Sequence, residues 1–155
     1  EGIKFEYVVA GWGPERPYLE KLSAKLGLNE SVRFQDALTG ENYPNQLAQT
    51  HVFLLPSLRD SAGATLMEAM LAGCVPVVVK AGGPGEIVNE ACGVRISPKS
   101  PGYVIDEIVL AVRELNANRQ RLAAMGEQAS ARIRDEFSVG HYLETIDSIY
   151  QKVVH

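Results

Sequence analysis

Two carboxylates, Asp60 and Glu68, stand eight residues apart on either side of a run of small residues. An apolar pattern of helical spacing follows that run. Free backbone N–H groups and the positive end of a helix dipole favour a phosphate group at such a turn. Small side chains let a ligand approach the backbone closely. The residues that we expect to line a phosphorylated ligand are Ser61, Ala62, Gly63, Ala64 and Thr65.

The two carboxylates invite different roles. Glu68 lies about one helical turn into the helix, where a carboxylate accepts two hydrogen bonds from a vicinal diol such as a ribose. Because its neighbours are nearly all apolar, we expect that it needs a partner. Asp60 precedes the helix, and it either contacts a sugar hydroxyl or caps the helix start. The spacing alone leaves these two roles of Asp60 equally open.

Alternating strands and helices must position these side chains. Strands are expected at residues 5–10, 32–37, 51–55, 75–79 and 93–96, and helices at 17–26, 43–49, 64–72, near 85, from 101, at 119–137 and from 139. Ser100 and Ser138 are the expected caps of two of these helices. The pattern predicts an α/β fold, a Rossmann-like doubly wound parallel sheet of about five strands with a helical carboxyl-terminal end. Residues 1–155 are interpreted as a single domain.

Ligands bind at the carboxyl ends of the strands in such sheets. Three glycine-rich turns follow strands here, at residues 11–14, 61–63 and 82–85, and all three should lie along one edge. We expect Gly11 and Gly13 to form a turn near a nucleotide, although a tight turn without a ligand explains them equally well. Trp12 between them is interpreted as a lid or a packing residue.

Composition excludes several classes of function. The chain has 155 residues, 46% hydrophobic and 22% charged, with a net charge of −4. The Lys and Arg residues are scattered and form no basic cluster that would bind nucleic acid. No apolar run is long enough to span a membrane. Cys74 and Cys92 are expected to be reduced core thiols. The three histidines have no ligand spacing, so we predict no metal site, and we expect a cytoplasmic protein.

The residues resemble the signature of retaining, nucleotide-sugar-dependent glycosyltransferases of family four, which have the GT-B fold. The resemblance covers nearly the whole chain, because several blocks occur in order at the expected spacing. These blocks are Pro56-Ser57-Leu58 with Asp60 and Gly63, Glu68-Ala69-Met70, Gly73, Pro76-Val77-Val78, Gly82 to Val88, Gly11 to Pro14, and Phe137 to Tyr150. The resemblance implies that this sequence is the carboxyl-terminal, donor-binding half of a longer two-domain chain.

The resemblance also implies roles for individual residues. Glu68 would bind the ribose, Asp60 would contact the transferred sugar, and the segment around Ala37 and Leu38 would pass near the base. The donor would be a nucleoside diphosphate sugar, with no tightly bound cofactor and no metal. The complete enzyme would be a hexosyltransferase, and this fragment alone would be inactive. Acceptor binding and any membrane contact would belong to the amino-terminal domain, and the last helix would reach back across that domain.

Three departures from the family pattern bear on these roles. The first acidic position is usually Glu, and Asp60 is one methylene shorter. Ala62 replaces a common aromatic residue and leaves more room near the sugar. The Arg and Lys that hold the diphosphate in the family normally precede the first strand, outside this sequence. Charge stabilisation of the leaving diphosphate would therefore come from beyond residues 1–155.

Two other classes of function stay open. One is another GT-B enzyme, such as a sugar-nucleotide epimerase or a glycan phosphorylase. A phosphorylase needs a lysine for pyridoxal phosphate, and the surroundings of Lys80 do not match that use. The other class is a non-catalytic Rossmann-like binding module. Ser57 and Ser61 have no His and Asp pattern that would form a triad, so no side chain is a convincing nucleophile.

Overall fold

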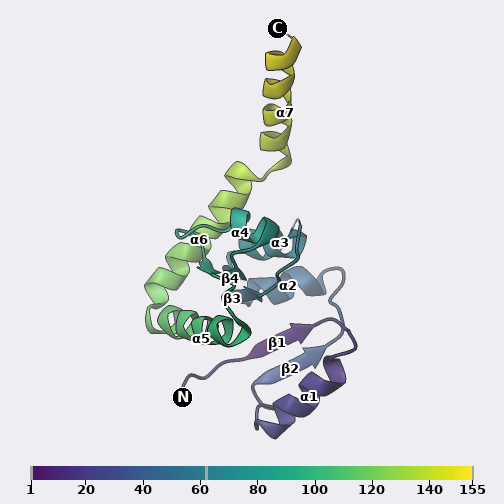
Figure 1. The fold of residues 1–155 in the computed structure, drawn as a ribbon, viewed down its shortest axis with the longest axis vertical. Coiled ribbons are helices and arrows are strands. Elements are labelled where there is room, and N and C mark those ends of the chain that lie inside the picture. The colour runs from purple at the N-terminus through teal and green to yellow at the C-terminus, as the bar shows by residue number, and fades with distance from the viewer. Residues whose placement is uncertain (1, 62, 155) are drawn as a thin grey trace. The chain divides into compact units, whose positions relative to one another are not determined.

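The computed structural model of the protein describes residues 2–61 and 63–154 (Figure 1). The chain divides into two compact units, Glu1–Gln46 and Leu47–His155, and each is described here by itself. Helix α2 (Asn42–Ala48) spans the division between them. In both units strands and helices alternate, as the sequence predicts.

The first unit is built on two parallel strands. β1 (Tyr7–Ala10) pairs with β2 (Val32–Gln35), with Tyr7 opposite Val32 and Ala10 opposite Gln35. Helix α1 (Arg16–Lys25) connects them and has a proline in its first turn. Proline is tolerated there because its missing N–H would have no partner within the helix. This connection brings the carboxyl ends of both strands to the same edge.

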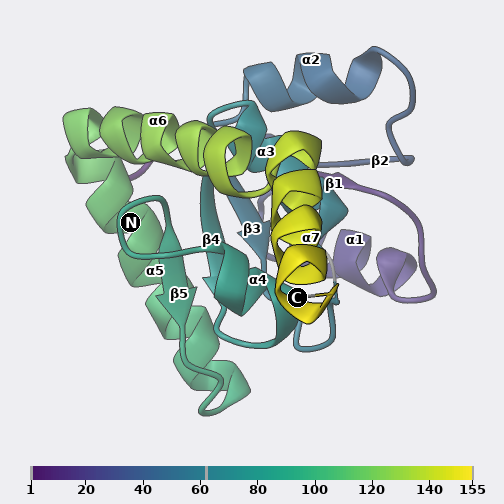
Figure 2. The ribbon, with the colours of Figure 1, turned by 90° about the horizontal axis from the view of Figure 1, so that it is seen from above.

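The second unit holds a three-stranded parallel sheet in the order β3-β4-β5. The strands are β3 (Val52–Leu55), β4 (Val75–Val79) and β5 (Val94–Ile96). Helices α3 (Ala64–Leu71) and α4 (Gly82–Ile87) follow the first two strands. The chain then continues as α5 (Pro101–Ala117), α6 (Arg119–Glu136) and α7 (Val139–Val154) (Figure 2).

The predicted fold class is confirmed. Five parallel strands occur in the expected order among the described residues, and they are hydrogen-bonded as a pair and a triplet. The strands are shorter than expected, β1 beginning at Tyr7 rather than residue 5 and β2 ending at Gln35 rather than residue 37. The hydrogen-bonded pairing of β1 with β2 stops at these residues, so neighbouring residues that favour a strand by composition lie in the flanking loops.

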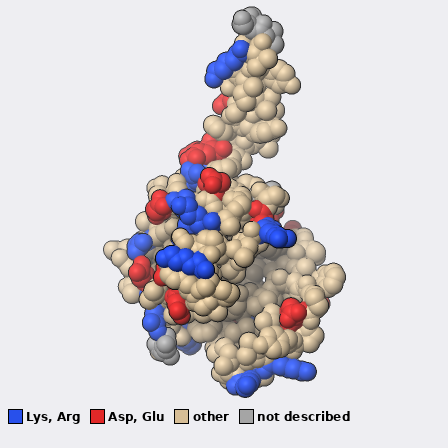
Figure 3. Space-filling model, in the orientation of Figure 1, with Lys and Arg blue, Asp and Glu red and all other residues tan. Residues whose placement is uncertain are grey.

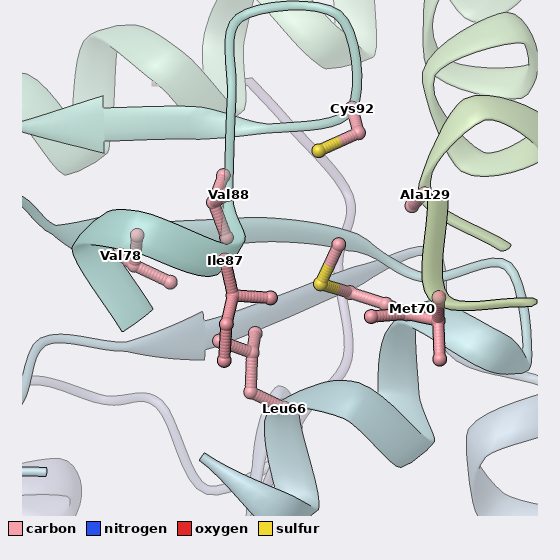
Figure 4. Close-up of a cluster of buried hydrophobic side chains, with 8 residues drawn as sticks. Leu66, Met70, Val78, Ile87, Val88, Cys92 and Ala129 are labelled. Atoms are coloured by element: carbon pink, nitrogen blue, oxygen red, sulfur yellow. The ribbon is translucent and has the colours of Figure 1, made fainter. Parts of the chain in front are cut away.

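Strand β4 is the centre of the core in the second unit, since all five of its residues are buried. Its side chains alternate between two faces of the sheet. Val78 joins a cluster with Leu66 and Met70 of α3 (Figure 4), whereas Val77 joins one with Leu115 of α5. Burial of each such side chain stabilises the fold by roughly 1.5–3 kcal/mol. The two clusters therefore fix α3 against one face and α5 against the other.

The carboxyl-terminal helices have the predicted caps. The Ser100 hydroxyl oxygen accepts a hydrogen bond of 3.2 Å from the Tyr103 N–H, and the Ser138 hydroxyl oxygen accepts one of 3.2 Å from the His141 N–H. Helix α7 leaves its apolar side chains exposed, with Leu143 at 60% and Val153 at 78%. None of the helices in the described residues is long and apolar enough to cross a membrane.

Candidate functional site

The turn between β3 and α3 is organised by Asp60. Its Oδ1 atom accepts a hydrogen bond of 2.8 Å from the Gly63 N–H. Gly63 is the N-cap residue of α3 and has a left-handed backbone, with φ of 56°. Asp60 therefore closes the turn that leads into α3 from three residues before the N-cap, and it does not cap the helix itself, as one of its two expected roles required. The neighbouring site candidate Ala62 lies outside the described residues.

The next turn along the sheet is bound to the same aspartate. The Gly83 N–H donates a hydrogen bond of 3.0 Å to the carbonyl oxygen of Asp60. A Cβ atom at Gly82 would lie 2.5 Å from that oxygen, and Gly82 has a φ of 55°. Only glycine fits this conformation and this close approach without strain. The turns after β3 and β4 therefore meet at one edge, as predicted, and Asp60 links them.

Helix α3 places Glu68 on its exposed side. Leu66, Ala69 and Met70 are buried, whereas Thr65, Glu68 and Leu71 follow one another at three-residue spacing on the exposed face. The expectation that the apolar surroundings force a partner on Glu68 is wrong, because its carboxylate faces solvent. Among the residues that the structure describes, no hydrogen bond or ion pair engages this carboxylate. Glu68 is thus available to a ligand from outside the helix.

Helix α6 fixes the far end of α3. The Ser130 hydroxyl donates a hydrogen bond of 2.7 Å to the Leu71 carbonyl oxygen, and Arg134 Nη1 donates one of 2.7 Å to the Ser130 hydroxyl oxygen. Gly126 lets the two helices approach, since a Cβ atom there would lie 2.4 Å from the Gly73 carbonyl oxygen. These contacts were not predicted from the sequence. Their one sequence signal is Gly126, a glycine inside an expected helix.

The first unit contains the other site candidates. Gly11 has a φ of 133°, and its N–H donates a hydrogen bond of 3.0 Å to the Gln35 carbonyl oxygen. Trp12 is 88% exposed, so the interpretation of this side chain as a packing residue is wrong. Ala37 is exposed and Leu38 is half-buried, directly after β2. Gly13 precedes α1, and a Cβ atom there would meet nothing within 4 Å.

Charged groups are dispersed, with Lys, Arg, Asp and Glu interspersed over the face in Figure 3. Arg95 on β5 donates a hydrogen bond of 3.3 Å to the Gly85 carbonyl oxygen and pairs with Glu90. A second hydrogen bond, from Arg95 Nη2 to Glu90 Oε1, lowers the pKa of the Glu90 carboxyl. Within residues 2–61 and 63–154, no group of three or more His, Cys, Asp or Glu could hold a metal ion.

Solved structures identify the fold. A sucrose-phosphate synthase from Thermosynechococcus elongatus superposes with a TM-score of 0.78 at 19% identity, over 95% of this chain and 38% of its own. Anabaena HepE in complex with UDP-glucose superposes with a TM-score of 0.75 at 23% identity, over 95% of this chain and 41% of its own. The fold is the Rossmann-like α/β fold of GT-B glycosyltransferases.

Sequence comparison gives the family. Residues 1–132 match the family described as Glycosyl transferases group 1, and the chain belongs to that family. A 2-deoxystreptamine glucosyltransferase of Streptomyces kanamyceticus is 28% identical over 99% of this chain and 39% of its own length. An uncharacterised glycosyltransferase of Methanocaldococcus jannaschii is 36% identical over 63% of this chain and 25% of its own length. The chain thus spans well under half of these relatives.

Proposed function

We propose that this chain is the donor-binding domain of a retaining glycosyltransferase of family four. The complete protein would transfer a hexose from a nucleoside diphosphate sugar to an acceptor. Family membership supports this proposal. So do the names of its relatives, which include a D-inositol 3-phosphate glycosyltransferase of Salinispora tropica, 30% identical over 94% of this chain. Anabaena HepE has been solved with UDP and with UDP-glucose.

The observation that carries the proposal is the exposed carboxylate of Glu68, one turn into α3, which makes no hydrogen bond or ion pair with the residues that the structure describes. A carboxylate in this position accepts hydrogen bonds from the two hydroxyls of a ribose. The turn of residues 61–65 at the amino end of the same helix would receive the diphosphate, because helix N-termini favour anions. In this proposal the nucleotide lies along the start of α3.

Asp60 would contact the transferred sugar. Its Oδ1 atom is occupied by the Gly63 N–H, and the side chain is half-buried. The second carboxylate oxygen is the atom that we assign to a sugar hydroxyl. The link from Gly83 to the carbonyl oxygen of Asp60 fixes the backbone from which this carboxylate extends. Sugar contact is therefore compatible with the hydrogen bond by which Asp60 closes the turn before α3.

The chemistry would be positioning and electrostatic stabilisation of the departing diphosphate, without metal or tightly bound cofactor. The basic groups that neutralise the diphosphate would belong to the chain outside residues 1–155. The acceptor would bind to an amino-terminal domain of the same protein, in the cytoplasm. The exposed apolar side of α7, with Leu143, Ile149 and Val153, would pack on that domain.

Ligand-observed NMR of the chain with UDP, GDP and ADP tests the proposal. We expect one nucleotide to bind, and Glu68→Ala to weaken it about 10- to 100-fold, since a hydrogen bond to a charged group contributes about 1.5–3 kcal/mol. Glu127→Ala is the matched control, because Glu127 is an exposed glutamate on another helix. Binding that is equal in both variants would overturn the assigned role of Glu68.

A further inference from the structure

Arg132 on α6 is held in one orientation by three groups. Its Nε atom donates a hydrogen bond of 2.6 Å to the carbonyl oxygen of Ile87, the last residue of α4. Its Nη1 atom donates to both carboxylate oxygens of Glu136, each at 2.6 Å. The guanidinium carbon lies 5.4 Å from the centroid of the Phe137 ring, and the side chain is only 17% exposed. Because its charge is paired and its plane is fixed, Arg132 presents a rigid donor to the end of α4.

Helix α4 is short, and its end depends on that donor. It has six residues, Gly82–Ile87, and the backbone becomes extended at Val88. The carbonyl groups in the last turn of a helix have no partner inside the helix. A helix of this length is not stable in water by itself. Contacts from other elements therefore decide where α4 ends and how firmly it is held.

Both ends of α4 contact the surroundings of Asp60. At its start, the Gly83 N–H donates a hydrogen bond of 3.0 Å to the Asp60 carbonyl oxygen. At its end, the buried Ile87 side chain packs with Leu66 of α3 (Figure 4). The Cδ1 atom of Ile87 lies 3.7 Å from the position that a Cβ atom of Gly63 would occupy, and the Gly63 N–H donates to Asp60 Oδ1. Helix α4 thus bonds the Asp60 backbone and packs behind the residue that holds its carboxylate.

We propose that Arg132 is a positioning residue for the donor sugar. Through the Ile87 carbonyl it fixes α4, and α4 fixes the carboxylate of Asp60. This role rests on the proposed function, which assigns the second carboxylate oxygen of Asp60 to a sugar hydroxyl. All of these residues belong to the second unit. Because Arg132 acts through α4, its loss should weaken binding of the sugar and spare that of the nucleotide, which the proposed function places at Glu68.

Arg134 offers a matched control two residues further along α6. Its Nη1 atom donates to the Ser130 hydroxyl oxygen, and that hydroxyl donates to the Leu71 carbonyl oxygen at the far end of α3. Arg134→Ala removes the same charge from the same helix, yet it acts at the opposite end of α3 from Asp60. An effect that both variants share would therefore come from α6 as a whole and not from α4.

Amide hydrogen exchange followed by NMR tests the positioning without any ligand. Arg132→Ala should accelerate exchange of the Gly63 and Gly83 amides about 10-fold more than that of Val78, a β4 amide that reports unfolding of the sheet. Arg132→Lys, which retains the charge and a donor, should restore part of this protection. Arg134→Ala should leave both glycine amides protected. Equal acceleration at all three amides in Arg132→Ala would show a purely structural role and overturn the inference.

Calorimetry measures the effect on the donor, with UDP, ADP and GDP compared with UDP-glucose, ADP-glucose and GDP-mannose. Arg132→Ala should weaken the nucleotide sugar about 10-fold and leave its parent nucleotide within about two-fold of the wild type. Unchanged affinity for the nucleotide sugar, equal weakening of both ligands, or the same loss in Arg134→Ala overturns the positioning role and leaves donor binding intact. Absence of wild-type binding for every ligand overturns the proposed function of this chain, and the sugar role of Arg132 with it.

Discussion

The Oδ1 atom of Asp60 accepts a hydrogen bond of 2.8 Å from the backbone N–H of Gly63. The backbone oxygen of the same aspartate accepts one of 3.0 Å from the N–H of Gly83. One residue thereby closes the turn before α3 and holds the turn after β4. A substitution at this position tests the turn hydrogen bond and the proposed sugar contact separately, because the two roles need different properties of the side chain.

Asp60→Asn should leave the free energy of unfolding within about 0.5 kcal/mol of the wild type, because the amide oxygen of Asn accepts the same hydrogen bond from the Gly63 N–H. Asp60→Ala should lower the free energy of unfolding by about 1 kcal/mol, because it removes that hydrogen bond. If Asp60 contacts the sugar, both variants should bind UDP-glucose more weakly and UDP equally well. Urea denaturation and calorimetry measure these effects. Wild-type affinity of Asp60→Asn for UDP-glucose would argue against the contact.

Gly82→Ala should destabilise the second unit, because the added Cβ atom would lie 2.5 Å from the Asp60 carbonyl oxygen. A backbone oxygen cannot move aside as a flexible side chain does, so we expect a loss of about 1–3 kcal/mol. Gly102→Ala is the control, since its Cβ atom would meet nothing within 4 Å and the residue lies in α5. Equal midpoints of urea denaturation for both variants would contradict the close contact.

Gly126→Ala should separate α6 from α3, because the new Cβ atom would lie 2.4 Å from the Gly73 carbonyl oxygen. Overpacking of this kind costs about 1–3 kcal/mol. Gly140→Ala in α7, whose Cβ atom would come no closer than 3.9 Å to Ser138, should instead stabilise its helix slightly. Thermal unfolding followed by circular dichroism distinguishes the two. A stabilised Gly126→Ala variant would refute the tight helix contact.

Cys74 should respond to alkaline pH. Its thiol is free and buried, and this burial raises its pKa from 9.0 to about 11. As the pH rises through that range, the unfolded chain releases the thiol proton and the folded chain retains it. Stability should therefore fall between these two pH values. Cys74→Ala should lose less stability over the same range, as urea denaturation can measure, and identical slopes would contradict the shifted pKa.

Local patterns in the sequence were enough to predict the strands and helices and the order in which they occur. Val75 to Val79 is a continuous apolar run, and it forms the fully buried strand that such a run predicts. Ser100 followed by Pro101 predicts a helix start, and Ser100 caps that helix. The blocks around Asp60 and Glu68 indicated a GT-B glycosyltransferase, and residues 1–132 match the family Glycosyl transferases group 1. These features depend on neighbours within a few residues, which one sequence displays.

Tertiary contacts decided which candidate site residues are exposed on the surface. The apolar neighbours of Glu68 suggested that its carboxylate needs a partner, yet Leu66 and Met70 pack against Val78 of β4 and turn Glu68 outward. Trp12 looked like a lid or a packing residue, and none of the described residues of its unit buries it. The link from Gly83 to Asp60 joins residues 23 positions apart. Composition and spacing cannot reveal such features, because exposure depends on which surfaces meet when distant segments fold together.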